Sequence, residues 1–126
     1  NGGKTMLVAI SSKGNSIECM MDPRFGRAEY FIIADTDTME FEVVENAAAV
    51  AGGGAGITSG QLMIDKDVQA VITGNIGPNA MSVLAAANIE IYRGVSASVK
   101  ENVEKLNKGL LEEISKTVPP HSGING

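Results

Sequence analysis

The sequence lacks the residues on which several common classes of site depend. Its 126 residues include one cysteine, one histidine, no tryptophan, three phenylalanines and two tyrosines. A single cysteine cannot form a disulfide within the chain or supply a site of several thiolates. A single histidine near the end of the chain, His121, argues against Ser-His-Asp or Cys-His catalysis. The scarcity of aromatic residues argues against a platform that stacks nucleic-acid bases.

Basic charge and long apolar runs are also scarce. The chain has 10 Lys and Arg against 15 Asp and Glu, a net charge of −5, which argues against a phosphate backbone as partner. No apolar run approaches the roughly 18 residues of a membrane-spanning helix. Residues 1–5 lack the basic-then-apolar layout of a signal peptide. We therefore expect a cytoplasmic protein that binds neither nucleic acid nor membrane.

What the chain does have is an alternation of short apolar runs with amphipathic stretches. Strands are predicted at residues 6–11, 30–35, 41–45, 68–73 and 89–92. Helices are predicted at residues 57–67 and 78–87 and between Ser98 and Gly109, where Ser98 and Glu101 have the capping-box spacing. The last helix carries an apolar stripe formed by Val99, Val103, Leu106 and Leu110.

The order β-β-β-α-β-α-β-α predicts an α/β domain with a mixed five-stranded sheet and flanking helices. The short polar turn at 36–39 predicts an antiparallel hairpin between the second and third strands. Later strands are separated by helices, which predicts parallel crossovers. We expect one domain over residues 6–114, with flexible termini at 1–5 and 115–126.

Three connections are expected to meet at the carboxyl edge of this sheet, where ligands bind in open α/β folds. The first, 12–29, contains Cys19, Met20, Met21, Asp22, Arg24 and Arg27. The second, 46–56, ends in Gly52, Gly53, Gly54, Ala55 and Gly56, and the third is Gly74, Asn75, Ile76 and Gly77. A glycine-rich turn that leads into a helix exposes backbone N–H groups that favour an anion. We therefore predict an anion site that the two arginines help to close.

Each of these features also has a simpler interpretation. The glycine turns can serve as a linker or a helix cap, and neither matches a GxGxxG or P-loop motif. The two arginines can pair on the surface with Asp22 or Glu29. Cys19 with the two following methionines offers soft sulfur donors to a metal, although a lone cysteine is more often a small buried hydrophobe.

Several motifs, taken in order, resemble the nitrogenase iron–molybdenum cofactor biosynthesis family, which includes the NifX-type proteins and the C-terminal domain of NifB. The resemblance covers about residues 6–113. It is carried by DPRFGRA at 22–28 followed by Tyr30 and Phe31, Asn46 ahead of 52–56, VITGNIGPNA at 71–80 and IYRGV at 91–95.

The resemblance implies a ribonuclease H-like fold and a non-catalytic carrier of an anionic metal–sulfur cluster. The implied cargo is an iron–molybdenum cofactor precursor or a molybdenum–copper sulfide cluster, exchanged with partner proteins of cluster assembly. The implied contacts are Arg24, Phe25, Gly26 and Arg27, the glycine turns, and Asn75, with Cys19 as a candidate metal contact.

Two absences qualify what the resemblance implies. The ribonuclease H active site begins with an Asp on the first strand, and residues 6–11 contain no carboxylate, which argues against nuclease chemistry. Some relatives have His or Cys within the segment 47–54, where this chain has neither. We therefore expect hydrogen bonds and charge to hold any cluster.

An interaction or regulatory module without a cluster remains the alternative, and nucleotide binding ranks lower because the P-loop lysine is absent.

Overall fold

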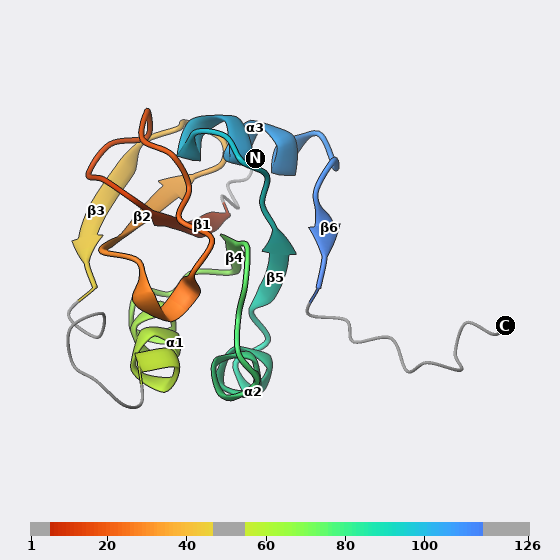
Figure 1. The fold of residues 1–126 in the computed structure, drawn as a ribbon. Helices are drawn as coiled ribbons and strands as arrows, with labels where there is room; N and C mark the ends of the chain where they lie inside the picture. Colours follow the sequence, from red (N-terminus) through yellow and green to blue (C-terminus); the bar gives the residue numbers. More distant parts are fainter. Residues whose placement is uncertain (1–5, 47–54, 115–126) are drawn as a thin grey trace, which may run out of the picture.

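The computed structural model describes residues 6–46 and 55–114, which form one mixed sheet with helices on both faces (Figure 1). The strands are β1 (Leu7–Ser12), β2 (Tyr30–Asp35), β3 (Phe41–Glu45), β4 (Ala70–Thr73), β5 (Glu90–Arg93) and β6 (Glu112–Glu113). The helices are α1 (Ala55–Asp65), α2 (Pro78–Ala86) and α3 (Val99–Asn107), with a short 3₁₀ helix, η1 (Phe25–Arg27), between β1 and β2.

The strand order across the sheet is β3-β2-β1-β4-β5-β6. β2 is antiparallel to both β1 and β3, and β4 lies between β1 and β5 and is parallel to both. The predicted hairpin and the predicted parallel crossovers are therefore confirmed. Because β1, β4 and β5 run in the same direction, the connections that follow them leave from one edge of the sheet.

The predicted count of five strands is wrong, because the described residues form six. β6 has only two residues, and it pairs antiparallel with β5. The Ile114 N–H also donates to the Ile91 carbonyl at 2.7 Å. Two adjacent glutamates show no apolar alternation, so only their pairing with β5 reveals the strand.

The ribonuclease H-like label stays a prediction, and the proposed flexible termini, 1–5 and 115–126, lie outside the described residues.

Apolar side chains lie on both faces of the sheet, which explains the unbroken apolar runs of its central strands. α1 and α2 cover one face, and α3 covers the other (Figure 1). The largest buried side chains on the α1/α2 face are Phe25, Phe31, Met63, Val71, Leu84 and Ile91, and those on the α3 face are Val8, Ile10, Ile32, Ile72, Val99 and Val103. No helix in the described parts of the chain has the length and apolar character needed to cross a membrane.

The helix α3 lies between Ser98 and Gly109, as predicted. The Ser98 hydroxyl accepts a hydrogen bond from the Glu101 N–H at 3.0 Å, which confirms the capping interaction. The helix ends at Asn107, and Gly109 has a φ of +71°, which favours glycine and redirects the chain. Leu110 therefore does not extend the apolar stripe, and it is 61% exposed.

One buried polar side chain on α3 holds the turn that follows β5. The Asn102 Oδ1 accepts from the Val95 N–H at 2.8 Å. Its Nδ2 donates to the carbonyls of Val95 and Ser98 at 3.2 and 2.9 Å. Since Asn102 is fully buried, these bonds replace the water that its amide and the turn would otherwise need. This role of Asn102 was not predicted, although its place between Val99 and Val103 puts a polar residue on the inward face of the helix.

We expect Asn102→Ala to lower the free energy of unfolding by about 1–3 kcal/mol, because buried polar groups of the turn would lose their partners. Urea unfolding followed by circular dichroism measures the change. Lys100→Ala, on the exposed face of the same helix, is the control, and its effect should stay within about 0.5 kcal/mol. Equal unfolding midpoints for the two variants would show that the Asn102 bonds contribute nothing.

Candidate functional site

The long connection between β1 and β2 divides into two halves that lie on opposite faces of the sheet. Its first half, residues 13–21, packs against the beginning of α3. The Cys19 carbonyl accepts from the Val99 N–H, and the Ile17 carbonyl accepts from the Lys100 N–H, both at 2.8 Å. Its second half, residues 22–29, contains η1, which packs against α1 on the other face. Residues that are neighbours in the sequence thus belong to different surfaces.

The second half of this connection pairs with the turn that follows β4. Arg24 and Asn75 form a parallel bridge, in which the Phe25 N–H donates to the Asn75 carbonyl at 3.1 Å and the Asn75 N–H donates to the Pro23 carbonyl. At Gly74 an added Cβ would lie 2.6 Å from the Pro23 Cβ, so only glycine allows this approach. The structure therefore brings the first and third predicted connections into direct contact.

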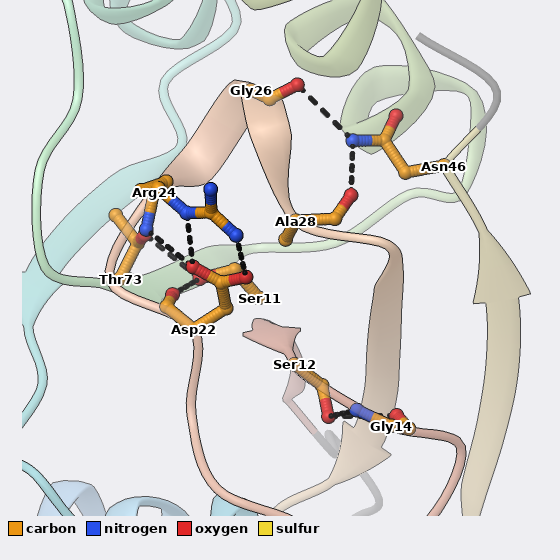
Figure 2. A network of polar contacts seen from close by, with 9 residues as sticks. All are labelled: Ser11, Ser12, Gly14, Asp22, Arg24, Gly26, Ala28, Asn46 and Thr73. Carbon is orange, nitrogen blue, oxygen red and sulfur yellow. Dashed lines mark hydrogen bonds and ion pairs between the residues drawn. The ribbon is translucent and has the colours of Figure 1, made fainter. Parts of the chain in front are cut away.

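Asp22 and Arg24 form a bidentate ion pair at the start of this segment (Figure 2). The Asp22 Oδ1 accepts from the Arg24 backbone N–H at 2.9 Å and from its Nε at 3.0 Å, and Oδ2 accepts from Nη2 at 2.9 Å. The Asp22 side chain is 3% exposed and that of Arg24 is 63% exposed. The hydrogen bond from the Arg24 side chain lowers the pKa of the Asp22 carboxyl, against the effect of burial. Of the two interpretations of Arg24, the structure therefore shows the pairing with Asp22.

Two buried hydroxyls fix the Asp22 backbone to the ends of β1 and β4. The Ser11 hydroxyl donates to the Asp22 carbonyl at 2.6 Å and lies 2.8 Å from the Thr73 hydroxyl. Because the single Ser11 proton is used on Asp22, Thr73 is the donor to Ser11 Oγ. The Asp22 N–H donates back to the Ser11 carbonyl at 2.8 Å. This pair was not predicted; its signal in the sequence is a hydroxyl residue at the carboxyl end of each of the two apolar strands.

The first turns of α1 and α2 lie side by side at the carboxyl edge. A Cβ added to Gly56 would be 3.4 Å from the Ala80 Cβ, and one added to Gly60 would be 3.0 Å from Val83 Cγ1. The two helices therefore run in the same direction, with their N-termini adjacent. Gly77, the N-cap of α2, offers no side-chain acceptor to the first turn. Both positive dipole ends therefore face the same edge.

η1, which carries Arg27, packs against α1. The Phe25 side chain is buried, with its ring centroid 5.2 Å from that of Phe31, and anchors η1 against α1. Gly26 and Arg27 form the outer part of the turn, and Arg27 is exposed. Within the described segments, no ion pair or hydrogen bond engages the Arg27 side chain. The two arginines of the motif thus differ, since Arg24 is paired with Asp22 and Arg27 has no partner among the described residues.

Asn46, directly after β3, connects η1 to α1. Its Nδ2 donates to the carbonyls of Ala28 and Gly26 at 2.9 and 3.4 Å (Figure 2). Its Oδ1 accepts from the Ser59 hydroxyl of α1 at 3.1 Å, and its backbone N–H donates to the Glu29 carbonyl at 2.9 Å. Asn46 and Ser59 are both buried.

The remaining predicted residues fall in several places. Cys19 is half-buried and its Sγ lies against Gly14, on the α3 side rather than beside Arg27. Met20 is exposed and Met21 is buried in the core beneath α3. Gly52, Gly53 and Gly54 lie outside the described residues. Within residues 6–46 and 55–114, no group of three or more His, Cys, Asp or Glu side chains is placed to hold a metal ion.

A hollow of about 440 Å³ lies on the other side of the Gly74–Gly77 turn. It is lined by Gly74, Asn75, Ile76, Met81, Arg93, Glu112, Glu113 and Ile114. The Arg93 Nη1 donates to the Gly74 carbonyl at 3.0 Å, and its Nε lies 3.4 Å from Glu112 Oε1. Arg93 therefore supports from β5 the same turn that Pro23 contacts from the β1–β2 connection.

Asp22→Asn should lower the free energy of unfolding at pH 7 by about 1–3 kcal/mol, because a neutral amide loses the charge-assisted bonds to Arg24. The folded protein lowers the pKa of Asp22, so its contribution is complete above the unfolded value of about 3.9. That contribution is lost as the pH falls through the lowered pKa, and the wild-type advantage should shrink with it.

Urea unfolding at a series of pH values tests this expectation. Asp37→Asn, at an exposed position in the β2–β3 turn, is the matched control and should leave the free energy of unfolding nearly unchanged. A difference between wild type and Asp22→Asn that stays constant down to about pH 2 would contradict the assigned role of the carboxylate.

Comparison with known proteins gives consistent results. The family described as dinitrogenase iron-molybdenum cofactor matches residues 4–109. An uncharacterised protein of Methanocaldococcus jannaschii is 34% identical over 113 residues, which are 87% of this chain and 92% of that protein.

Two solved structures share both the fold and a substantial part of the sequence. The apo form of the orange protein from Desulfovibrio gigas has a TM-score of 0.82 and 30% identity, over 89% of this chain and 95% of that chain. A Thermotoga protein described as a candidate NifB has a TM-score of 0.77 and 38% identity, over 90% of this chain and 97% of that chain. The chain therefore belongs to the dinitrogenase iron-molybdenum cofactor family.

Proposed function

We propose that this protein is a non-catalytic carrier that binds an anionic metal–sulfur cluster where η1 meets the first turns of α1 and α2. Membership of the dinitrogenase iron-molybdenum cofactor family supports this class of cargo. The observation that carries the proposal is that the N-termini of α1 and α2 are adjacent at the carboxyl edge of the sheet, and that η1, which carries Arg27, packs against α1. The cargo would be an iron–molybdenum cofactor precursor or another molybdenum-containing sulfide cluster.

Main-chain N–H groups would supply most of the contacts. The first-turn N–H groups of a helix, here those of Gly56 and Ile57 in α1 and Asn79 in α2, have no acceptor within their helix. With the two helix dipoles they favour negative charge, as sulfide and oxyanion groups carry. The Ile57 side chain, 48% exposed, offers an apolar contact beside these donors. Arg27 adds a full positive charge that no described carboxylate neutralises.

Hydrogen bonds and charge would hold the cargo in place of a set of metal-ligating side chains. Such a site releases its cargo without breaking metal–protein bonds, which suits a protein that passes a cluster to a partner. Arg24 has a different role in this proposal, because its guanidinium binds Asp22 and stabilises the segment that leads into η1. Arg27 is therefore the cation that we expect to contact the cargo.

Titration of the purified protein with tetrathiomolybdate, with and without Cu(I), tests the proposal. We expect a change in the visible charge-transfer absorption and an increase in mass by native mass spectrometry. Arg27→Ala should weaken binding by about 10- to 100-fold, the loss typical of a hydrogen bond to a charged group. Added salt should also weaken binding, because part of the attraction is between charges at the surface.

Lys100→Ala removes an exposed positive charge on the opposite face of the sheet and should bind like the wild type. If the wild-type protein shows neither a spectral change nor a mass increase, the carrier proposal fails and a protein-interaction module is favoured. If Arg27→Ala and Lys100→Ala bind equally well, the cargo does not lie at η1.

A further inference from the structure

We propose that Asn46 is a positioning residue that sets η1, and with it Arg27, against the first turns of α1 for anion binding. The inference rests on the proposed function, and it adds a residue that itself contacts no cargo. It is carried by four hydrogen bonds that join the end of β3, the η1 segment and α1 through one buried side chain and its backbone.

η1 is too short to be stable without contacts to its surroundings. It has three residues, and Arg24 at its N-cap makes no side-chain capping bond. Its one internal bond in the described structure, from the Arg27 N–H to the Arg24 carbonyl, is 3.3 Å long. A 3₁₀ turn of this length depends on its surroundings. Phe25 fixes one side of the turn in the core, and the carbonyls of Gly26 and Ala28 on the other side both point toward the Asn46 amide (Figure 2).

The same amide fixes the turn relative to the helix. The Asn46 Oδ1 accepts from Ser59, which lies one helical turn after Gly56 in α1. A shift of η1 along α1 would therefore break either the bonds to the carbonyls or the bond to Ser59. Because Asn46 and Ser59 are buried, no solvent would replace these bonds at low cost.

Asn46 also affects the electrostatics of the edge. The carbonyl oxygens of Gly26 and Ala28 carry partial negative charge, and both are directed inward onto an N–H₂ group. Without this donor, the two carbonyls would be free to turn toward solvent beside Arg27, where they would repel an anion. Asn46 should therefore influence anion affinity as well as stability.

The chain contains a matched control for this idea. Asn102 is also a buried asparagine whose amide binds the carbonyls of a loop, but it lies on the α3 side of the sheet. Its loss should lower stability without changing the surface that carries Arg27. A purely structural role for Asn46 would make the two variants alike in both stability and binding.

The test compares tetrathiomolybdate affinity and thermal unfolding for the wild type, Asn46→Ala and Asn102→Ala, with titrations at a temperature where all three are folded. We expect both variants to unfold at lower temperature. Asn46→Ala should bind about 10-fold more weakly, and Asn102→Ala should bind like the wild type. In a protein that already carries Arg27→Ala, Asn46→Ala should weaken tetrathiomolybdate binding by a smaller factor, because the two residues act through the same contact.

The outcomes separate this inference from the proposed function. If the wild-type protein does not bind the probe, the proposed function fails. If the wild type binds and folded Asn46→Ala binds equally well, the positioning role is overturned. Should Asn46→Ala not fold, Ser59→Ala removes only the bond to α1 and should weaken binding by about 2- to 5-fold, whereas unchanged affinity in that variant would overturn the inference.

Discussion

The attachment of Asp22 to the carboxyl edge of the sheet is the constraint on which the rest of the site depends. Its backbone is held by Ser11, its carbonyl also lies beside the Ser11–Thr73 hydroxyl pair, and its buried carboxylate is neutralised by Arg24. A carboxylate at this depth would be costly without that guanidinium. Once Asp22 is fixed, the next residues can pair with the turn after β4 and lead into η1.

The two arginines of the motif at residues 22–28 are chemically identical, but their surroundings give them different roles. Arg24 folds back on a carboxylate two residues away and serves the structure. Arg27 stands at the end of a 3₁₀ turn whose other contacts are made by Phe25 and by backbone carbonyls, so its charge stays available. The two buried asparagines also have the same chemistry in different places. The Asn46 amide donates to a backbone carbonyl on the α1/α2 side of the sheet, and the Asn102 amide does so on the α3 side.

Much of the fold was predictable because its signals are local. The strands at 30–35 and 41–45 agree with the prediction at every residue, since each is bounded by a polar turn or a charged residue. Ser98 and Gly109 marked the ends of the third helix through capping chemistry that involves only nearby residues. β6 and the exposure of Leu110 were not predictable, because both depend on where the chain goes after Gly109.

By itself, the sequence determined the alternation of strands and helices, the antiparallel hairpin and the glycine-containing turn before α2. It could not decide which arginine is paired, that residues 13–21 and 22–29 lie on opposite faces, or that Asn46 reaches both η1 and Ser59. Those facts depend on contacts between residues distant in the chain, and such contacts exist only once the sheet brings the ends of β1, β3 and β4 to the same region. The tertiary structure thus decided which of the predicted side chains could act together.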